Sequence, residues 1–119
     1  MKRLFALFAL TALALTACGP KAQPGTYVDT WHHIAEAAQA NDCEGLALYM
    51  TERLQFTDQD CAEVSSLIQD GVFDEINWDS TKMEESDTKA TAYLKDGTKL
   101  THFLLGDDKV WRADTIFWR

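Results

Sequence analysis

The spacing of hydrophobic residues divides this chain into a helical half and a strand half, and the change comes at Gly71. Before Gly71, apolar residues recur every three or four positions, which is typical of amphipathic helices. After Gly71, apolar and polar residues alternate, which is typical of half-buried strands. The sequence therefore predicts helices followed by an antiparallel sheet, the α+β class.

The first half predicts three helices. The first follows Thr26 and ends near Asn41, the second covers 43–50, and the third follows Thr57. An aspartate stands three residues after each threonine, a spacing typical of a capping box. The inner stripes of the first and third helices are Tyr27, Trp31, Ile34 and Ala38, and Cys61, Val64, Leu67 and Ile68.

The second half predicts four strands, over 73–84, 88–95, 98–105 and 109–118. The strands are separated by turns at 85–87, 96–97 and 106–108. A two-residue turn at Asp96-Gly97 would place Thr91 opposite His102. The predicted pairs are Lys95 with Thr98, Tyr93 with Leu100, Thr91 with His102, Leu104 with Trp111, and His102 with Ala113.

This register gives the sheet two faces that are both rich in apolar residues. A sheet covered on one side only would alternate apolar with polar residues. Either helices cover one face and a partner or the membrane-side tether covers the other, or the register is wrong by one residue. The first face carries Thr91, Tyr93, Leu100, His102, Leu104, Trp111, Ala113 and Phe117, and the second carries Ala90, Ala92, Leu94, Phe103, Leu105, Val110, Arg112, Asp114, Ile116 and Trp118.

The N-terminus has the pattern of a secretory signal peptide. Lys2 and Arg3 precede an apolar run over 4–15, which is too short to span a bilayer. Leu15-Thr16-Ala17-Cys18 resembles the lipobox of bacterial lipoproteins. The resemblance implies cleavage before Cys18 and a lipid anchor on that cysteine, with diacylglycerol and an N-acyl chain such as palmitate. The alternative is an ordinary signal peptide whose removal leaves a free thiol.

This interpretation predicts a signal peptide over 1–17, a flexible tether over 18–25 and a single domain over 26–119. The tether is rich in proline and glycine, which favours a spacer without a fixed fold. We expect the protein in the cell envelope. Gly19, rather than an aspartate, follows the lipid cysteine, so in a Gram-negative host we expect the outer membrane, facing the periplasm.

The charge of the chain is strongly acidic. Its formal net charge is −8, from 11 basic and 19 acidic side chains. Cleavage would remove Lys2 and Arg3, so 9 basic side chains would remain and the charge would be −10. This charge argues against nucleic acid as a partner and against electrostatic adhesion to anionic lipid. The predicted attachment to the membrane is therefore the acyl chains.

Two further cysteines, Cys43 and Cys61, would lie in an oxidising compartment, where a disulfide is the simplest interpretation. A zinc site is the alternative, but neither cysteine belongs to a CxxC pair. We therefore predict a disulfide and no metal.

The domain also resembles the nuclear transport factor 2-like group of the cystatin-like α+β superfamily, including small exported lipoproteins. The resemblance rests on the segments 27–31, 40–47 and 106–114. It implies a curved, cone-like sheet with helices on one face, an inward Trp111, and dimers in many members. The outer face would then offer Phe103, Leu105, Val110 and Ile116 to a second copy or to an envelope protein.

The candidate polar group of a pocket is His102, with Thr91, Tyr93 and Trp111 near it. An imidazole near its ordinary pKa can bind or transfer a proton. The alternative is a histidine at the rim with no chemical task. His32 with Glu36 would be a weak metal pair, and a solvated helix face is the alternative.

The sequence contains no residue set that matches the acid-base sets of enzymes in the resembling family. We therefore predict no catalytic residues, no cofactor, and a lipid-anchored, non-enzymatic binding or assembly module. The alternative is a small-molecule binder or an enzyme that uses a cone-shaped pocket near His102.

Overall fold

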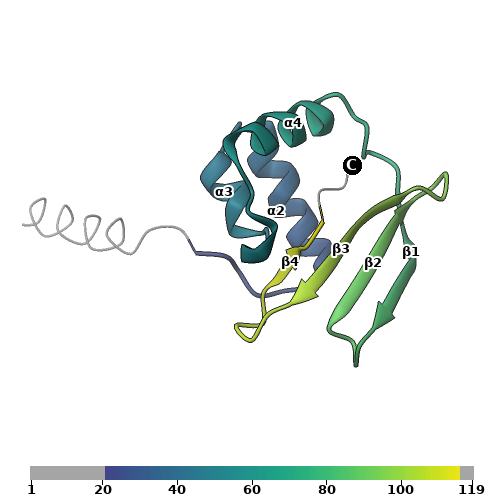
Figure 1. Ribbon diagram of the computed structural model, residues 1–119. Coiled ribbons are helices and arrows are strands. Elements are labelled where there is room, and N and C mark those ends of the chain that lie inside the picture. Colours follow the sequence, from purple (N-terminus) through teal and green to yellow (C-terminus); the bar gives the residue numbers. More distant parts are fainter. Residues whose placement is uncertain (1–20, 116–119) are drawn as a thin grey trace, which may run out of the picture.

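The computed structural model describes residues 21–115, and the fold is α+β as predicted (Figure 1). Several predictions fall outside the described residues: the predicted signal peptide over 1–17, Cys18, and Ile116, Phe117 and Trp118. The elements are α2 (Tyr27–Gln39), α3 (Cys43–Leu48), the 3-10 helix η1 (Glu52–Leu54), α4 (Asp58–Gln69), β1 (Ile76–Glu84), β2 (Lys89–Leu94), β3 (Lys99–Leu105) and β4 (Trp111–Ala113).

Both predicted capping boxes are present. The Thr26 hydroxyl accepts a hydrogen bond from the Asp29 N–H, and the Asp29 carboxylate accepts one from the Thr26 N–H at 2.9 Å. Thr57 and Asp60 repeat this arrangement at the start of α4. Because each box satisfies backbone donors that a helix start leaves unpaired, it fixes where the helix begins.

The short helix α3 ends at Leu48, two residues earlier than predicted. The chain there becomes extended and runs beside β4: Thr51 N–H donates to the Ala113 carbonyl at 2.9 Å, and Ala113 N–H donates to the Tyr49 carbonyl at 2.8 Å. These bonds use backbone groups that a longer helix would need. The backbone pairing of this segment with β4 therefore ends α3 at Leu48.

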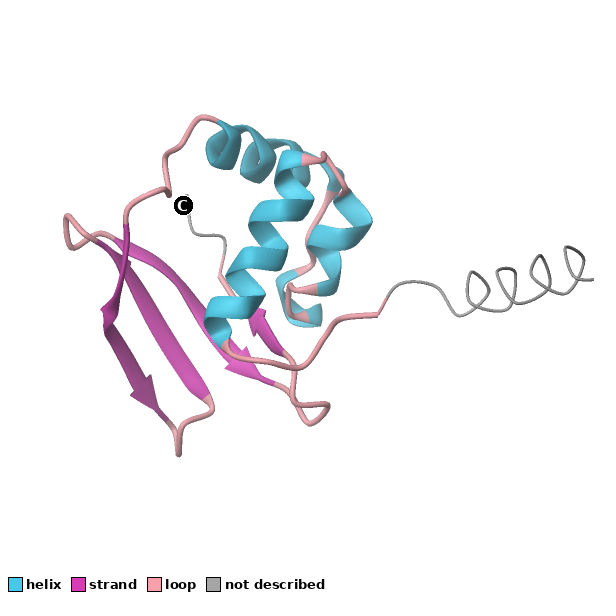
Figure 2. Cartoon of the chain, turned by 180° about the vertical axis from the view of Figure 1, so that it is seen from behind, coloured by secondary structure: helices cyan, strands magenta, loops and turns pink. Residues whose placement is uncertain are grey.

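The four strands form one antiparallel sheet in the order β1-β2-β3-β4, with the helices packed on one of its faces (Figure 2). The first and last strands are shorter than predicted. Phe73 lies before β1 and packs edge-on against Trp31, with ring centroids 5.9 Å apart. An irregularity between Asn77 and Lys82 interrupts the pairing of β1 with β2.

The hairpin between β2 and β3 confirms part of the predicted register. Thr91 pairs with His102 as predicted, but Tyr93 pairs with Lys99 instead of Leu100. The turn is one residue longer than expected, because the Leu94 N–H donates to the Thr98 carbonyl at 2.7 Å around a left-handed Gly97 (φ 91°). The register shift that follows leaves Leu100 fully buried.

In the hairpin between β3 and β4, the predicted register is wrong by one residue. Trp111 pairs with Leu105, and Leu104 pairs with Arg112. This turn is also longer than predicted: the Gly106 N–H donates to the Val110 carbonyl at 2.9 Å, and Lys109 has a φ of 67°. Because side chains alternate along a strand, this shift moves Trp111 to the face that carries Phe103.

The shift overturns the predicted outer face. Phe103 is fully buried and Val110 is 2% exposed, so neither is available to a partner. Leu105 is half-buried against the same core, and Ile116 lies outside the described residues. The prediction of an inward Trp111 is confirmed, since it is 7% exposed.

Tyr27, at the start of α2, connects the core aromatic residues of the sheet. Its ring centroid lies 5.9 Å from that of Trp78, 6.2 Å from that of Phe103 and 5.6 Å from that of Trp111. Aromatic rings at these separations contribute attractive packing beyond their buried area. The core therefore lies between α2 and the inner face of the sheet.

Candidate functional site

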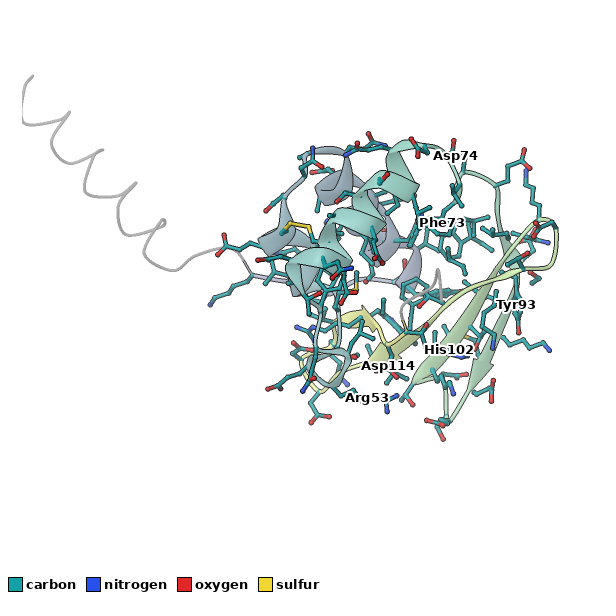
Figure 3. The ribbon with its side chains drawn as sticks, turned by 45° about the horizontal axis from the view of Figure 1, so that its top comes forward. Arg53, Phe73, Asp74, Tyr93, His102 and Asp114 are labelled. Atoms are coloured by element: carbon teal, nitrogen blue, oxygen red, sulfur yellow. A yellow bond between two sulfur atoms is a disulfide. The ribbon has the colours of Figure 1, made fainter. Side chains whose placement is uncertain are left out.

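The outer face of the sheet carries a row of polar side chains that crosses β1, β2 and β3 and ends just after β4. Lys82 of β1 pairs with Thr91 of β2, and Thr91 pairs with His102 of β3. Asp114, just after β4, donates its N–H to the His102 carbonyl at 2.8 Å. His102 and Asp114 lie near Arg53 on the same side of the molecule, with Tyr93 farther along the sheet (Figure 3).

His102 is held by Thr91. The Thr91 hydroxyl lies 2.8 Å from Nδ1 of His102, a hydrogen bond that fixes the orientation of the imidazole. Burial lowers the pKa of His102, and the positive charges of Lys99 and Lys89 lower it further. The imidazole therefore gives up its proton at a lower pH than an ordinary histidine does.

This pair does not form a nucleophile with its base. The Thr91 side chain is buried, with the residue 2% exposed, so a substrate cannot reach its hydroxyl. A nucleophile must contact the reacting atom. The imidazole of His102 is half-buried and can exchange a proton or a hydrogen bond with a ligand on the outer face.

Asp114 is a buried carboxylate with a cationic partner. It is 8% exposed, and it accepts hydrogen bonds from the Thr51 hydroxyl at 2.6 Å and from Nε of Arg53 at 2.7 Å. Arg53 also forms an ion pair with it. Burial raises the pKa of the Asp114 carboxyl, but the hydrogen bonds from Arg53 and Thr51 outweigh burial, so the pKa lies below its ordinary value.

A groove of about 720 Å³ lies between the segment 47–52 and the hairpin of β3 and β4. Its walls are mostly apolar and include Leu48, Met50 and Leu104, while Glu52 and Arg112 carry charges. Arg112 donates from Nε to the Leu48 carbonyl at 3.0 Å and binds Asp108 with both terminal nitrogens. Ligand pockets commonly have this volume and a mostly apolar lining.

The structure brings together three of the four predicted pocket residues. Thr91, Tyr93 and His102 share the outer face of the sheet, whereas Trp111 lies on the inner face. The one-residue register shift is the reason for this separation. These side chains therefore do not line a cone-shaped interior between helices and sheet, because Ala90, Ala92 and Phe103 fill the inner face.

Cys43 and Cys61 are joined as a disulfide, as predicted, with Cα atoms 5.7 Å apart. The bond connects the first residue of α3, Cys43, to Cys61 near the start of α4. Within residues 21–115, no group of three or more histidine, cysteine or acidic residues is placed to hold a metal ion. No helix of this described part is long and apolar enough to cross a membrane.

The two neighbouring histidines of α2 differ in their surroundings. His32 is exposed, whereas His33 stacks on Tyr49 with ring centroids 4.9 Å apart. The Tyr49 hydroxyl accepts a hydrogen bond from the Gln23 N–H at 2.9 Å. The predicted tether is thus held against the domain at Gln23.

Sequence reasoning missed the roles of Arg53 and Thr51. Arg53 is the single lysine or arginine between Lys21 and Lys82. This isolation in an acidic stretch is the sequence feature that could have indicated an acidic partner for Arg53. Its partner Asp114 lies 61 residues away, a distance over which no sequence periodicity applies.

Comparisons with protein-family models, with curated proteins and with solved structures found no match to this chain.

Proposed function

We propose that this chain is a lipid-anchored lipoprotein of the cell envelope and that its domain is a non-enzymatic binding module. The disulfide between Cys43 and Cys61 carries this proposal. Structural disulfides are typical of oxidising compartments outside the cytosol. The bond also uses both cysteines of the domain, which leaves Cys18 of the lipobox-like Leu15-Thr16-Ala17-Cys18 as the cysteine for lipid attachment.

The groove supports the binding role. Apolar walls at Leu48 and Leu104, with Glu52 and Arg112 beside them, suit an amphipathic segment of an envelope protein or of a second copy. The described side chains around His102 support catalysis less well, since Thr91 is buried and the imidazole lies on the outer face. A small-molecule binder remains the second candidate, because the groove volume also fits a small ligand.

Cys18→Ser tests the anchor. We expect the variant to lose its membrane attachment or to remain unprocessed, because acyl chains are the strong attachment that the sequence offers. Membrane fractionation and intact mass measure this result. Unchanged fractionation together with an unchanged mass would rule out lipidation.

Affinity purification from detergent-solubilised envelope tests the binding role. Ala47→Glu adds a charge to the groove, whereas Ala62→Glu adds the same charge to an exposed position of α4. We expect Ala47→Glu to lose bound protein and Ala62→Glu to retain it. If both variants retain the same proteins as the wild type, the groove is not the binding surface, and a thermal-shift screen for small molecules tests the second candidate.

A further inference from the structure

The disulfide between Cys43 and Cys61 has one exposed end and one buried end. Figure 3 shows this bond, in yellow, within the helical layer. Cys43, the first residue of α3, is exposed, whereas Cys61 on α4 is 2% exposed and belongs to the hydrophobic core. The two sulfur atoms of the bond therefore differ in how easily a molecule from solvent can reach them.

A hollow of about 190 Å³ opens beside the disulfide. Both cysteines line it, together with Ala47 and Phe56 as its apolar part. Thiol–disulfide exchange requires that an attacking thiolate reach one of the two sulfur atoms. The hollow gives a small thiol a path to the bond from solvent, so the disulfide is not sealed inside the core.

The rim of this hollow is acidic. Glu44 and Asp58 line it and are both exposed, and neither α3 nor α4 contains a lysine or an arginine. Like charges repel each other by an energy that depends on their separation and on screening by salt. A negatively charged thiol is therefore disfavoured at this site relative to a neutral or positively charged one.

We propose that Cys43 is a thiol–disulfide exchange site, attacked by a partner dithiol whose surroundings are not acidic. The partner's first thiolate bonds to Sγ of Cys43, the bond between Cys43 and Cys61 breaks, and its electron pair stays on Sγ of Cys61. The partner's second thiolate then displaces Sγ of Cys43 from the mixed disulfide. The partner leaves as a disulfide, and the two protons of its thiols end on the reduced Cys43 and Cys61.

The sulfur that leaves in the first step has a polar neighbour. The Ser65 hydroxyl lies 4.0 Å from Sγ of Cys61, and Ser65 is 3% exposed. A hydroxyl in this position can donate to the thiolate as its charge develops, and hydrogen bonds to ionised groups are stronger than neutral ones. The buried end of the disulfide is thus suited to be the leaving group, and the exposed end to be attacked.

Reduction would remove the covalent link between α3 and α4. α3 has six residues, of which Leu46 is buried, and its Ala47 and Leu48 line the groove described above. Exchange at Cys43 would therefore change how firmly one wall of the groove is held. This inference goes beyond the proposed function, and its chemistry does not depend on the lipid anchor.

The first test traps the mixed disulfide in the full chain purified in detergent. Iodoacetamide first blocks the Cys18 thiol of any chain without lipid, so the result is independent of the anchor. Mercaptoethanol is then added to the folded protein, N-ethylmaleimide in denaturant stops the reaction at short times, and peptide mass mapping locates the mercaptoethanol. We expect it on Cys43, with Cys61 carrying maleimide. Mercaptoethanol on Cys61, on both cysteines equally, or on neither would overturn the proposal.

The second test compares three thiols of different charge: cysteamine, mercaptoethanol and mercaptopropionate. Each rate is divided by the thiolate concentration and by the rate of the same thiol with hydroxyethyl disulfide, which removes differences in nucleophilicity. At low ionic strength we expect cysteamine to react about tenfold faster than mercaptopropionate, because of the acidic rim. Equal corrected rates would overturn the proposed preference for a partner without acidic surroundings.

Matched variants assign this preference to the rim. Glu44→Gln should reduce the ratio of the two rates by about threefold, because one of the two rim charges is lost. Glu36→Gln removes an exposed acid from α2 and should leave the ratio unchanged. If both variants change the ratio equally, the net charge of the protein selects the thiol, and the rim does not.

Discussion

The two outward surfaces of this domain differ in charge. The described helices α2, α3 and α4 contain no lysine or arginine, and their acidic residues are Asp29, Glu36, Glu44, Asp58, Asp60 and Glu63. The outer face of the sheet carries Lys82, Lys89 and Lys99, with Glu84 opposite Lys89. The net charge of −8 is therefore unevenly distributed, because the lysines and arginines of the described part lie outside these three helices.

This difference shows that net charge is a poor guide to what a single face can bind. The range of electrostatic interactions is about 8 Å at physiological ionic strength, so a ligand on the sheet responds to nearby lysines more than to distant helices. The helices and the sheet therefore present surfaces of different charge. The core between them decides whether either surface exists.

Phe103→Asp should have the largest effect on that core. Phe103 is fully buried between α2 and the sheet, so the variant loses its aromatic packing and buries a carboxylate. We expect a loss of at least about 4 kcal/mol in the free energy of unfolding, measured by urea denaturation.

Leu104→Asp is the matched control for the opposite face, because Leu104 is half-buried on the outer side. We expect Leu104→Asp to lower the free energy of unfolding by less than half as much as Phe103→Asp does. Equal losses for the two variants would contradict the assignment of the two faces.

The disulfide should contribute the next largest effect, and this effect should arise in the helical layer. Cys43 and Cys61 are 18 residues apart, which corresponds to about 3 kcal/mol in the chain-entropy estimate. Cys43→Ala with Cys61→Ala should lower the free energy of unfolding by that amount, measured by urea denaturation without reductant. NMR signals of Thr91 and His102 should keep their positions, and large changes there would show that the disulfide also shapes the sheet.

Asp114→Asn should have a smaller effect that depends on pH. At pH 7 we expect a loss of about 1 to 3 kcal/mol, because the charge-assisted bonds from Arg53 become neutral ones. The pKa of Asp114 is lower in the folded protein, so its contribution is present above the unfolded pKa of about 3.9. The contribution is lost as pH falls through the folded pKa.

Denaturation of the wild type and of Asp114→Asn from pH 7 to pH 2 measures this contribution. The difference between the two proteins should shrink toward the acidic end. A difference that stays constant over this range would show that the carboxylate charge is not the source of the stabilisation.

The helices were predictable because their signals are local. Thr26 and Thr57 fix helix starts through aspartates three residues away, and the two cysteines lie in first turns where their pairing is reasonable. The class of the fold and the disulfide could therefore be predicted from the sequence.

The sheet faces could not be predicted, because each depends on the length of a turn. Lys109 adopts a left-handed conformation that its residue type does not announce, and the extra residue in the turn moves Trp111 to the other face. The pair of Thr91 and His102 was predicted because it lies beyond the shift at Tyr93, where the original register is restored. The link from Arg53 to Asp114 has no local signal at all.

The contacts of α2 also set the order in which the chain can fold during synthesis. The Thr30 hydroxyl donates to the Trp111 carbonyl at 2.9 Å, across 81 residues of sequence. Tyr27, three residues earlier, packs against Trp78, Phe103 and Trp111. The first described helix can pack on α3 and α4 earlier, but Tyr27 and Thr30 cannot complete their contacts until β4 has been made. Contacts over such long separations form late and slowly, so the packing of Tyr27 and the hydrogen bond of Thr30 are expected among the last steps of folding.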